Sequence, residues 1–271
     1  MLRKMLKRFR NLIGPAQHTT LDLSPPVPNR LTYVVGDIHG CSALLDTLID
    51  MIRTDQGDRS ADWVFVGDYV DRGPDSAGVL RRLRALSDDP ARRVTCLMGN
   101  HEAMLLQFLK TPTESAEHWL LNGGLDTLSS FHVDRVAGSS PVERHEALAQ
   151  ELRRALPPGT EDWLSRLPMW WQSGNLAVVH ALTDGQRPLD EQPTETLLWA
   201  RPGKRLQPRG DGLWVAHGHT VTPEPAIRAG HIAVDTGAFR SGVLTAAAID
   251  KGDIRFLSTK VEHDVSKQWP G

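Results

Sequence analysis

The sequence has little cysteine, with only Cys41 and Cys96 among its 271 residues. Two cysteines cannot build a disulfide framework, and this pair lacks the close spacing of a cysteine zinc site. We interpret both as small buried residues, the usual place of free cysteine.

Long apolar runs are also absent. No stretch reaches the roughly 18 consecutive apolar residues that a membrane-spanning helix needs, and the N-terminus lacks the apolar block of a secretory signal. We therefore expect a cytoplasmic protein.

The whole chain has no large excess of charge, because 31 basic and 33 acidic residues leave a net charge of −2. Residues 1–13 differ, with five basic side chains, no acidic one, and apolar residues at helical spacing. This segment predicts a short amphipathic helix that either weakly contacts an anionic membrane or acidic partner, or remains a solvated tail. The rest is acidic, so we expect no nucleic-acid binding.

The order of apolar and polar segments predicts one α/β domain over residues 30–260. A basic segment and a proline-rich linker precede it at 1–29, and a tail follows at 261–271. Five apolar runs predict strands at 31–35, 63–66, 94–98, 176–179 and 213–216. Helical patterns occupy 42–53, 76–86, 102–109, 115–131 and 142–156, and the mostly helical region at about 103–168 predicts an insert.

Each predicted strand is followed by residues that can bind metal or phosphate. The sequences are GDIHG at 36–40, GDYVDRGP at 67–74, GNHE at 99–102, the single His180, and HGHT at 217–220. In open α/β sheets, ligands bind beyond the carboxyl ends of the strands. We therefore expect these loops to meet in one site.

The residue types in these loops suit a metal centre. Asp37 and His39 are two apart, so on an extended segment their side chains point to the same side. The carboxylate of Asp68 has two oxygens and could bridge two cations, while Arg72 offers a planar fork suited to phosphate. Glu102 is expected to be the first-turn acid of the following helix.

Three further residues complete the donor set. Asn100 offers an amide oxygen, and His180 and His219 offer imidazole nitrogens. This mixture favours manganese, iron, cobalt, nickel or zinc over calcium. His101, beside Asn100, could donate a proton.

GDIHG, GDYVDRG and GNHE, followed by His180 and HGHT, resemble the phosphoprotein phosphatase (PPP) family of calcineurin-like metallophosphoesterases. The resemblance spans about residues 31–248. NGG at 122–124, LLWAR at 197–201 and DTGA at 235–238 are similar to bacterial and phage serine/threonine phosphatases. The resemblance to this family implies a β-sandwich of two sheets flanked by helices.

The resemblance also implies roles for single residues. One metal would bind Asp37, His39 and Asp68, and the other would bind Asp68, Asn100, His180 and His219. His101 would be the general acid, assisted by Asp71, and Arg72 and Arg201 would hold the phosphate. Many relatives have glycine just after the histidine that matches His180, whereas Ala181 and Leu182 follow here, which predicts a small change in that loop.

Two divalent cations, with manganese the expected metal, would acidify a shared water and neutralise charge as hydroxide attacks phosphorus in line. We therefore expect hydrolysis of phosphoserine or phosphothreonine in proteins, or of small phosphoesters. One alternative is a hydrolase of diadenosine polyphosphates or other nucleotides. Another is an inactive phosphate-binding scaffold, which the presence of every ligand and of His101 disfavours.

Overall fold

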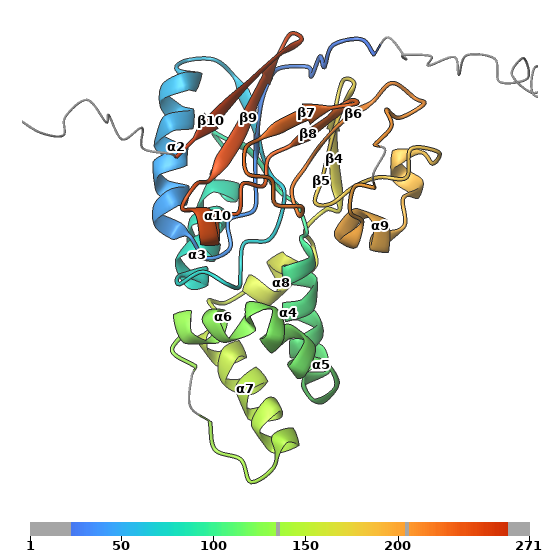
Figure 1. Ribbon diagram of the computed structural model, residues 1–271. Coiled ribbons are helices and arrows are strands. Elements are labelled where there is room, and N and C mark those ends of the chain that lie inside the picture. The colour runs from blue at the N-terminus through green and yellow to red at the C-terminus, as the bar shows by residue number, and fades with distance from the viewer. Residues whose placement is uncertain (1–22, 134–135, 204–205, 260–271) are drawn as a thin grey trace, which may run out of the picture.

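Two five-stranded sheets form the centre of the computed structural model, which describes residues 23–133, 136–203 and 206–259 (Figure 1). The first sheet contains, in spatial order, β10 (Asp253–Ser258), β9 (Thr245–Asp250), β1 (Leu31–Val35), β2 (Ala61–Phe65) and β3 (Arg93–Cys96). The second contains β4 (Trp170–Ser173), β5 (Leu176–Val179), β6 (Trp214–His217), β8 (His231–Ala233) and β7 (Ala226–Arg228). In each sheet three neighbouring strands are parallel, β1 to β3 in the first and β5, β6 and β8 in the second.

The core between the sheets explains why the central strands read as continuous apolar runs. Val34 of β1 packs into a buried cluster with residues of both sheets, including Val178 and Ile232. Its neighbours Tyr33 and Val35 face the opposite way, into the cluster beneath the helices. Because side chains alternate along a strand, a strand buried on both faces needs apolar residues at successive positions.

Helices cover the outer faces of the sandwich. α2 (Ser42–Gln56) and α3 (Ser76–Ser87) share the buried cluster of the first sheet. On the second sheet, η2 (Leu189–Glu191) and α9 (Thr194–Trp199) contribute to a smaller cluster. The predicted α/β sandwich flanked by helices is therefore confirmed.

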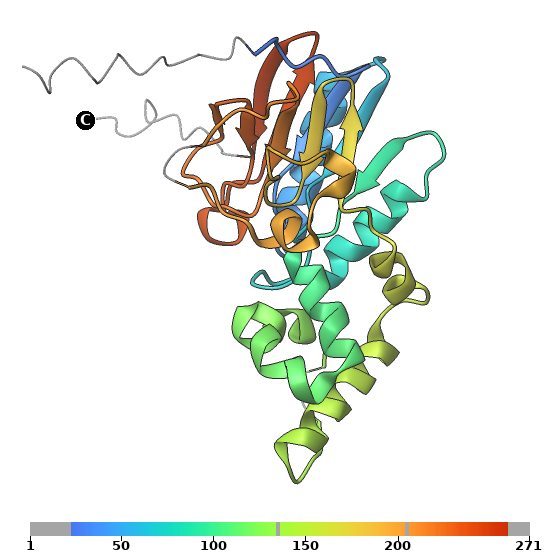
Figure 2. The ribbon, with the colours of Figure 1, turned by 90° about the vertical axis from the view of Figure 1, so that its right-hand side faces the viewer.

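A separate group of helices gathers at one end of the sandwich in both views (Figures 1 and 2). We call it the helical layer. It comprises α4 (Asn100–Lys110), α5 (Pro112–Trp119), the π-turn η1 (Leu120–Gly124), α6 (Leu125–Ser130), α7 (Pro141–Ala155) and α8 (Thr160–Ser165). These helices occupy the mostly helical region expected at about 103–168, and its assignment as an insert stays a prediction.

One predicted helix is wrong as a single element. Residues 115–131 form α5, η1 and α6 instead, because Gly123 has a φ of 110° that is not helical. The strands β4, β7, β8, β9 and β10 were not among the five predicted. Four of them are short or lie at sheet edges, where the apolar pattern that predicts a strand is weakest. β9 is central and buried, but its middle residues are alanines, which are weak strand formers.

The structure can also be compared with the predictions made for the cysteines, for membrane-spanning helices and for the two termini. Cys96 is buried as predicted, whereas Cys41 is only half-buried, and both thiols are free. No helix within the described ranges is long and apolar enough to cross a membrane. The basic segment at 1–13 and the tail at 261–271 lie outside the described residues, so the roles predicted for them stay predictions.

Candidate metal centre

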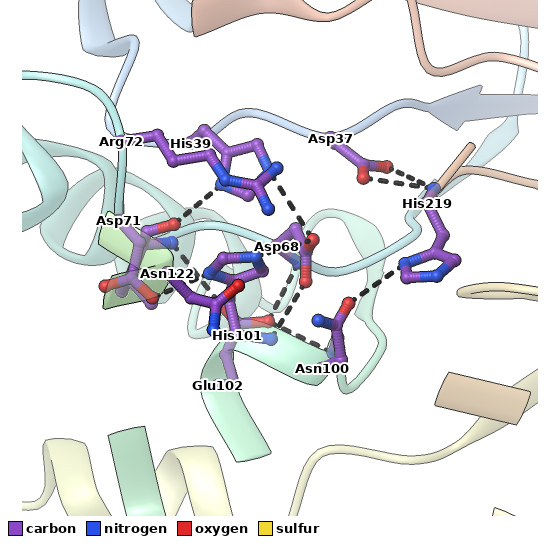
Figure 3. A network of polar contacts seen from close by, with 12 residues as sticks. Asp37, His39, Asp68, Asp71, Arg72, Asn100, His101, Glu102, Asn122 and His219 are labelled. Carbon is purple, nitrogen blue, oxygen red and sulfur yellow. Dashed lines mark hydrogen bonds and ion pairs between the residues drawn. The ribbon is translucent and has the colours of Figure 1, made fainter. Parts of the chain in front are cut away.

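The loops that follow β1, β2, β3, β5 and β6 meet at one edge of the sandwich, and Asp68 lies at their centre (Figure 3). His39 Nε2 is 3.4 Å from Asp68 Oδ2, and His180 Nε2 is 3.4 Å from Asp68 Oδ1. His39 follows a strand of the first sheet and His180 one of the second. The expected convergence therefore occurs, and it joins two sheets.

Asp68 is shared by two groups of side chains whose donor atoms all lie within 4.8 Å of one another. One group is His39, Asp68 and His101, and the other is Asp68, His180 and His219. Because its two carboxylate oxygens face different groups, Asp68 fits the bridging position expected for it.

Asn100 completes the second group. Its Oδ1 is 2.7 Å from His180 Nε2 and 3.1 Å from His219 Nδ1. The other ring nitrogen of His180 contacts the Val66 carbonyl oxygen at 3.1 Å. A backbone carbonyl in this place fixes the ring so that the opposite nitrogen faces the site, as is common for metal-binding histidine.

The geometry of the first loop differs from the extended segment that was expected. His39 has a φ of 45°, so the chain turns there. As a result the Asp37 carboxylate accepts hydrogen bonds from the His219 backbone N–H at 3.0 and 3.2 Å, while His39 faces Asp68. Asp37 thus lies at the centre but outside both groups named above.

The electrostatics of the site suit cations. Burial lowers the pKa of His39 to about 3 and that of His219 to about 4, which leaves both imidazoles neutral near pH 7 with a lone pair for a metal. Burial, and then the charges of Asp235 and Asp68, raise the pKa of Asp37 well above its usual range. His219 Nε2 is buried and has no hydrogen-bond partner among the described residues. The donor set therefore fits divalent metal.

Backbone strain is concentrated in the same loops. Five of the eight non-glycine residues with positive φ in the described chain are residues predicted for the site: His39, Asp68, Asp71, Arg72 and His219. The left-handed conformation costs a non-glycine residue about 1–3 kcal/mol, and such residues persist only where the surroundings hold them. The loops are therefore fixed by their contacts.

Glu102 supplies much of that restraint, in agreement with the possibility that this first-turn acid also orients its neighbours. It is buried, and its carboxylate accepts hydrogen bonds from the backbone N–H groups of Asp68, Tyr69, Val70 and Gly99. Through these bonds the first turn of α4 fixes the loop that carries Asp68.

His101 and Asp71 form a buried pair beside the two groups. His101 Nδ1 is 2.7 Å from Asp71 Oδ2, and His101 Nε2 has no hydrogen-bond partner among the described residues. Although burial lowers the pKa of His101, the charge of Asp68 and the bond to Asp71 raise it above its ordinary value. His101 is thus disposed to carry a proton with Nε2 free to deliver it.

The two arginines differ in their settings. Arg72 NH1 is 3.0 Å from His39 Nε2, and its guanidinium lies 5.1 Å from the ring centroid of Phe239 in α10 (Ala238–Ser241). Arg201 is exposed just after α9, and its charge is among the causes that lower the pKa of His219. Both guanidinium groups can therefore act on this site, Arg72 from within it and Arg201 from its rim.

Sequence reasoning missed three contributors to the site. Trp119 and Thr127 of the helical layer donate hydrogen bonds to Asp71, and no local pattern connects them with a loop about 50 residues earlier. Phe239 also went unrecognised, although it directly follows the DTGA sequence that had been singled out.

The comparisons with known proteins agree with the site. The family model described as calcineurin-like phosphoesterase matches residues 31–223. The chain is 32% identical over 231 residues to serine/threonine-protein phosphatase 1 of Salmonella typhimurium, covering 81% of this chain and 92% of that protein. The chain therefore belongs to the calcineurin-like phosphoesterase family, and within it to the PPP family that its loop motifs resemble.

Other relatives carry a different name. A symmetrical bis(5'-nucleosyl)-tetraphosphatase of Ralstonia nicotianae is 28% identical, with 79% of this chain and 88% of that protein covered. A crystal structure described as a candidate diadenosine tetraphosphatase matches with a TM-score of 0.59 and 27% identity, over 87% of this chain and 98% of that one. The relatives thus establish a metal-dependent phosphoesterase and divide over the substrate.

Proposed function

We propose that this protein is a dinuclear-metal phosphomonoesterase acting on phosphoserine or phosphothreonine. The observation that carries the proposal is the His101–Asp71 pair beside Asp68. His101 Nδ1 is hydrogen-bonded to Asp71, and Nε2 has no partner among the described residues. A serine or threonine alkoxide is a strongly basic leaving group, so its departure gains most from a held proton donor.

Within this proposal, Asp37, His39 and Asp68 would hold one cation, and Asp68, Asn100, His180 and His219 the other. Bound divalent metal, for which we propose manganese, would supply Lewis acidity at the phosphate and acidify a water. Arg72 and Arg201 would orient the phosphate oxygens. His101 would protonate the leaving oxygen, and Asp71 would stabilise the imidazolium until then.

A second candidate is hydrolysis of dinucleoside tetraphosphates. The relatives of that name in Ralstonia nicotianae and Janthinobacterium cover 79% of this chain each, close to the coverage by the phosphatase. Such a substrate has a phosphate leaving group of low basicity, which needs little help from His101.

A substrate panel separates the candidates. Manganese-loaded protein would be assayed on a phosphothreonine peptide and on diadenosine tetraphosphate, with the wild-type chain and His101→Asn in parallel. We expect faster turnover of the peptide, and a loss of about 100-fold or more in His101→Asn on that substrate, the usual scale of general acid catalysis. Faster turnover of the dinucleotide would favour the second candidate. No turnover of either, with His101→Asn behaving identically, would identify an inactive phosphate-binding protein.

A further inference from the structure

The Asp71 carboxylate forms hydrogen bonds with three side chains of the helical layer, namely His101 in the first turn of α4 and, deeper in the layer, Trp119 and Thr127. Thr127 Oγ1 donates to Asp71 Oδ1 at 2.6 Å, and Trp119 Nε1 lies 3.1 Å from both carboxylate oxygens. All three side chains are buried. Asp71 also has a φ of 70°, so it needs external contacts to keep its conformation.

The chemistry of Thr127 and Trp119 fixes their hydrogen-bonding roles toward Asp71. A threonine hydroxyl has one proton to give, and the Asp71 backbone N–H donates back to the Thr127 oxygen at 2.8 Å. An indole N–H can only donate, so Trp119 requires the Asp71 oxygens to act as acceptors. Thr127 bonds Oδ1 and the Trp119 contact is shared by both oxygens, so Oδ2 is the oxygen that faces His101 Nδ1.

Packing within the helical layer holds Trp119 in place against Asp71. The Trp119 indole stacks on Phe108 with ring centroids 4.5 Å apart, and a side chain at Gly124 would come within 2.6 Å of it. The Gly123 carbonyl oxygen accepts a hydrogen bond from the Arg72 backbone N–H at 3.3 Å. The NGG turn therefore brings the helical layer against the Asp71–Arg72 loop.

We propose that Trp119 and Thr127 are positioning residues that fix Asp71, aim His101 and thereby determine which leaving groups the site can expel. This inference rests on the proposed function. In the step concerned, the bond between phosphorus and the leaving oxygen breaks and its electron pair stays on that oxygen. The proton on His101 Nε2 passes to the oxygen, which leaves as an alcohol. A water oxygen forms the new bond to phosphorus, one water proton stays on the inorganic phosphate, and the other returns through solvent to His101.

Two aryl esters that differ in leaving-group basicity test the inference. 2,4-Dinitrophenyl phosphate releases a weakly basic phenolate that needs no proton, whereas phenyl phosphate releases a more basic one. We expect Thr127→Val and Trp119→Phe to lower kcat on phenyl phosphate by about tenfold or more, and to change it little on the dinitro ester. Thr127→Ser keeps the hydroxyl and should restore the wild-type ratio of the two rates.

A matched control comes from the first sheet. Trp63 is also a buried tryptophan whose indole N–H donates to a side chain, Gln56 Oε1 at 2.9 Å, but it lies outside the site. Trp63→Phe should leave the ratio unchanged. In a His101→Asn background, Thr127→Val should cost no further rate on phenyl phosphate, because the group it aims is gone.

Three outcomes separate the inference from the proposed function. Equal loss on both esters in Thr127→Val would overturn the inference alone, as would a loss that persists in His101→Asn. A wild-type protein inactive on both esters would overturn the proposed function together with the inference. If Trp119→Phe fails to fold, the Thr127→Val and Thr127→Ser pair decides the question by itself.

Discussion

Asp68 is the residue on which the candidate centre depends most, because both groups of donors include it. Its carboxylate is buried, which raises its pKa, yet the neighbouring imidazoles of His180, His101 and His39 hold that pKa well below its usual range. It is therefore available as an anion near pH 7.

Replacing Asp68 by asparagine should remove both metals, whereas His180→Asn should weaken only one site. Metal content after dialysis, measured by plasma emission, checks this difference. We expect Asp68→Asn to lower kcat/KM by about 1,000-fold, since metal contributes several kcal/mol and roughly 1.4 kcal/mol is tenfold in rate. Loss of a single equivalent in Asp68→Asn would contradict the bridging position.

The buried histidines make the metal-free protein sensitive to acid. Burial lowers the pKa of His217 from 6.5 to about 4. Its folded pKa is below the unfolded one, so its contribution to stability is complete above pH 6.5 and is lost as the pH falls toward about 4. We expect the metal-free protein to lose on the order of 1 kcal/mol of unfolding free energy per such group near pH 5.5.

Urea unfolding in the presence of a chelator, at pH 7.5 and at pH 5.5, measures this loss. His217→Gln should reduce the difference between the two pH values, while His132→Asn, at an exposed position, should preserve it. A difference that is the same in His217→Gln and the wild type would show that His217 does not contribute.

At the scale of elements, the π-turn between α5 and α6 joins the helical layer to the site. Gly124→Ala should displace the Trp119 indole, since the added carbon would lie 2.6 Å from that ring. We expect a destabilisation of about 1–3 kcal/mol, typical of overpacking, together with lower activity on phenyl phosphate. Gly210→Ala is the control, because nothing lies within 4 Å of the added carbon there. Thermal unfolding and steady-state rates measure both effects.

The sequence predicts elements well where one buried pattern persists. β1 and β5 begin and end where the apolar runs do, because their residues are buried on both faces and flanked by turns. The edge strands β7 and β4 were missed, because exposed or half-buried residues give no clear alternation. The contacts of Trp119 and Thr127 with Asp71 could not be predicted either, because they depend on how the helical layer packs and not on any spacing.

The donor residues themselves were predictable for a different reason. Asp68, His180 and His219 each lie within three residues of a strand end, so the strand pattern places them at one edge of the fold. The turn at His39 was not predictable, because a histidine with positive φ is unusual and is imposed by the surrounding contacts. As a result the residues at the centre were anticipated, whereas the orientation of Asp37 was not.

On the scale of the whole molecule, metal should stabilise the fold. Asp37, Asp68 and Asp235 are buried close together, and their mutual repulsion is among the causes that raise the pKa of Asp37. A cation relieves that repulsion only in the folded state. We expect removal of metal by a chelator to lower the melting temperature and added manganese to restore it. At a hundredfold excess over Kd, the metal should raise the free energy of unfolding by about 2.7 kcal/mol. Asp68→Asn should show no such recovery, and an equal recovery in that variant would place the stabilising metal elsewhere.

The residues expected to bind metal and those that position Asp71 come from different parts of the fold, which affects how this protein can diverge. The metal donors come from loops at the ends of the sheets, with Asn100 at the point where the helical layer begins, whereas Trp119 and Thr127 come from deep within that layer. Under the proposed positioning, mutations at Trp119 and Thr127 would alter proton delivery without changing the residues expected to bind metal. Such mutations would shift the preference between ester and anhydride substrates while the metal-binding loops stay the same.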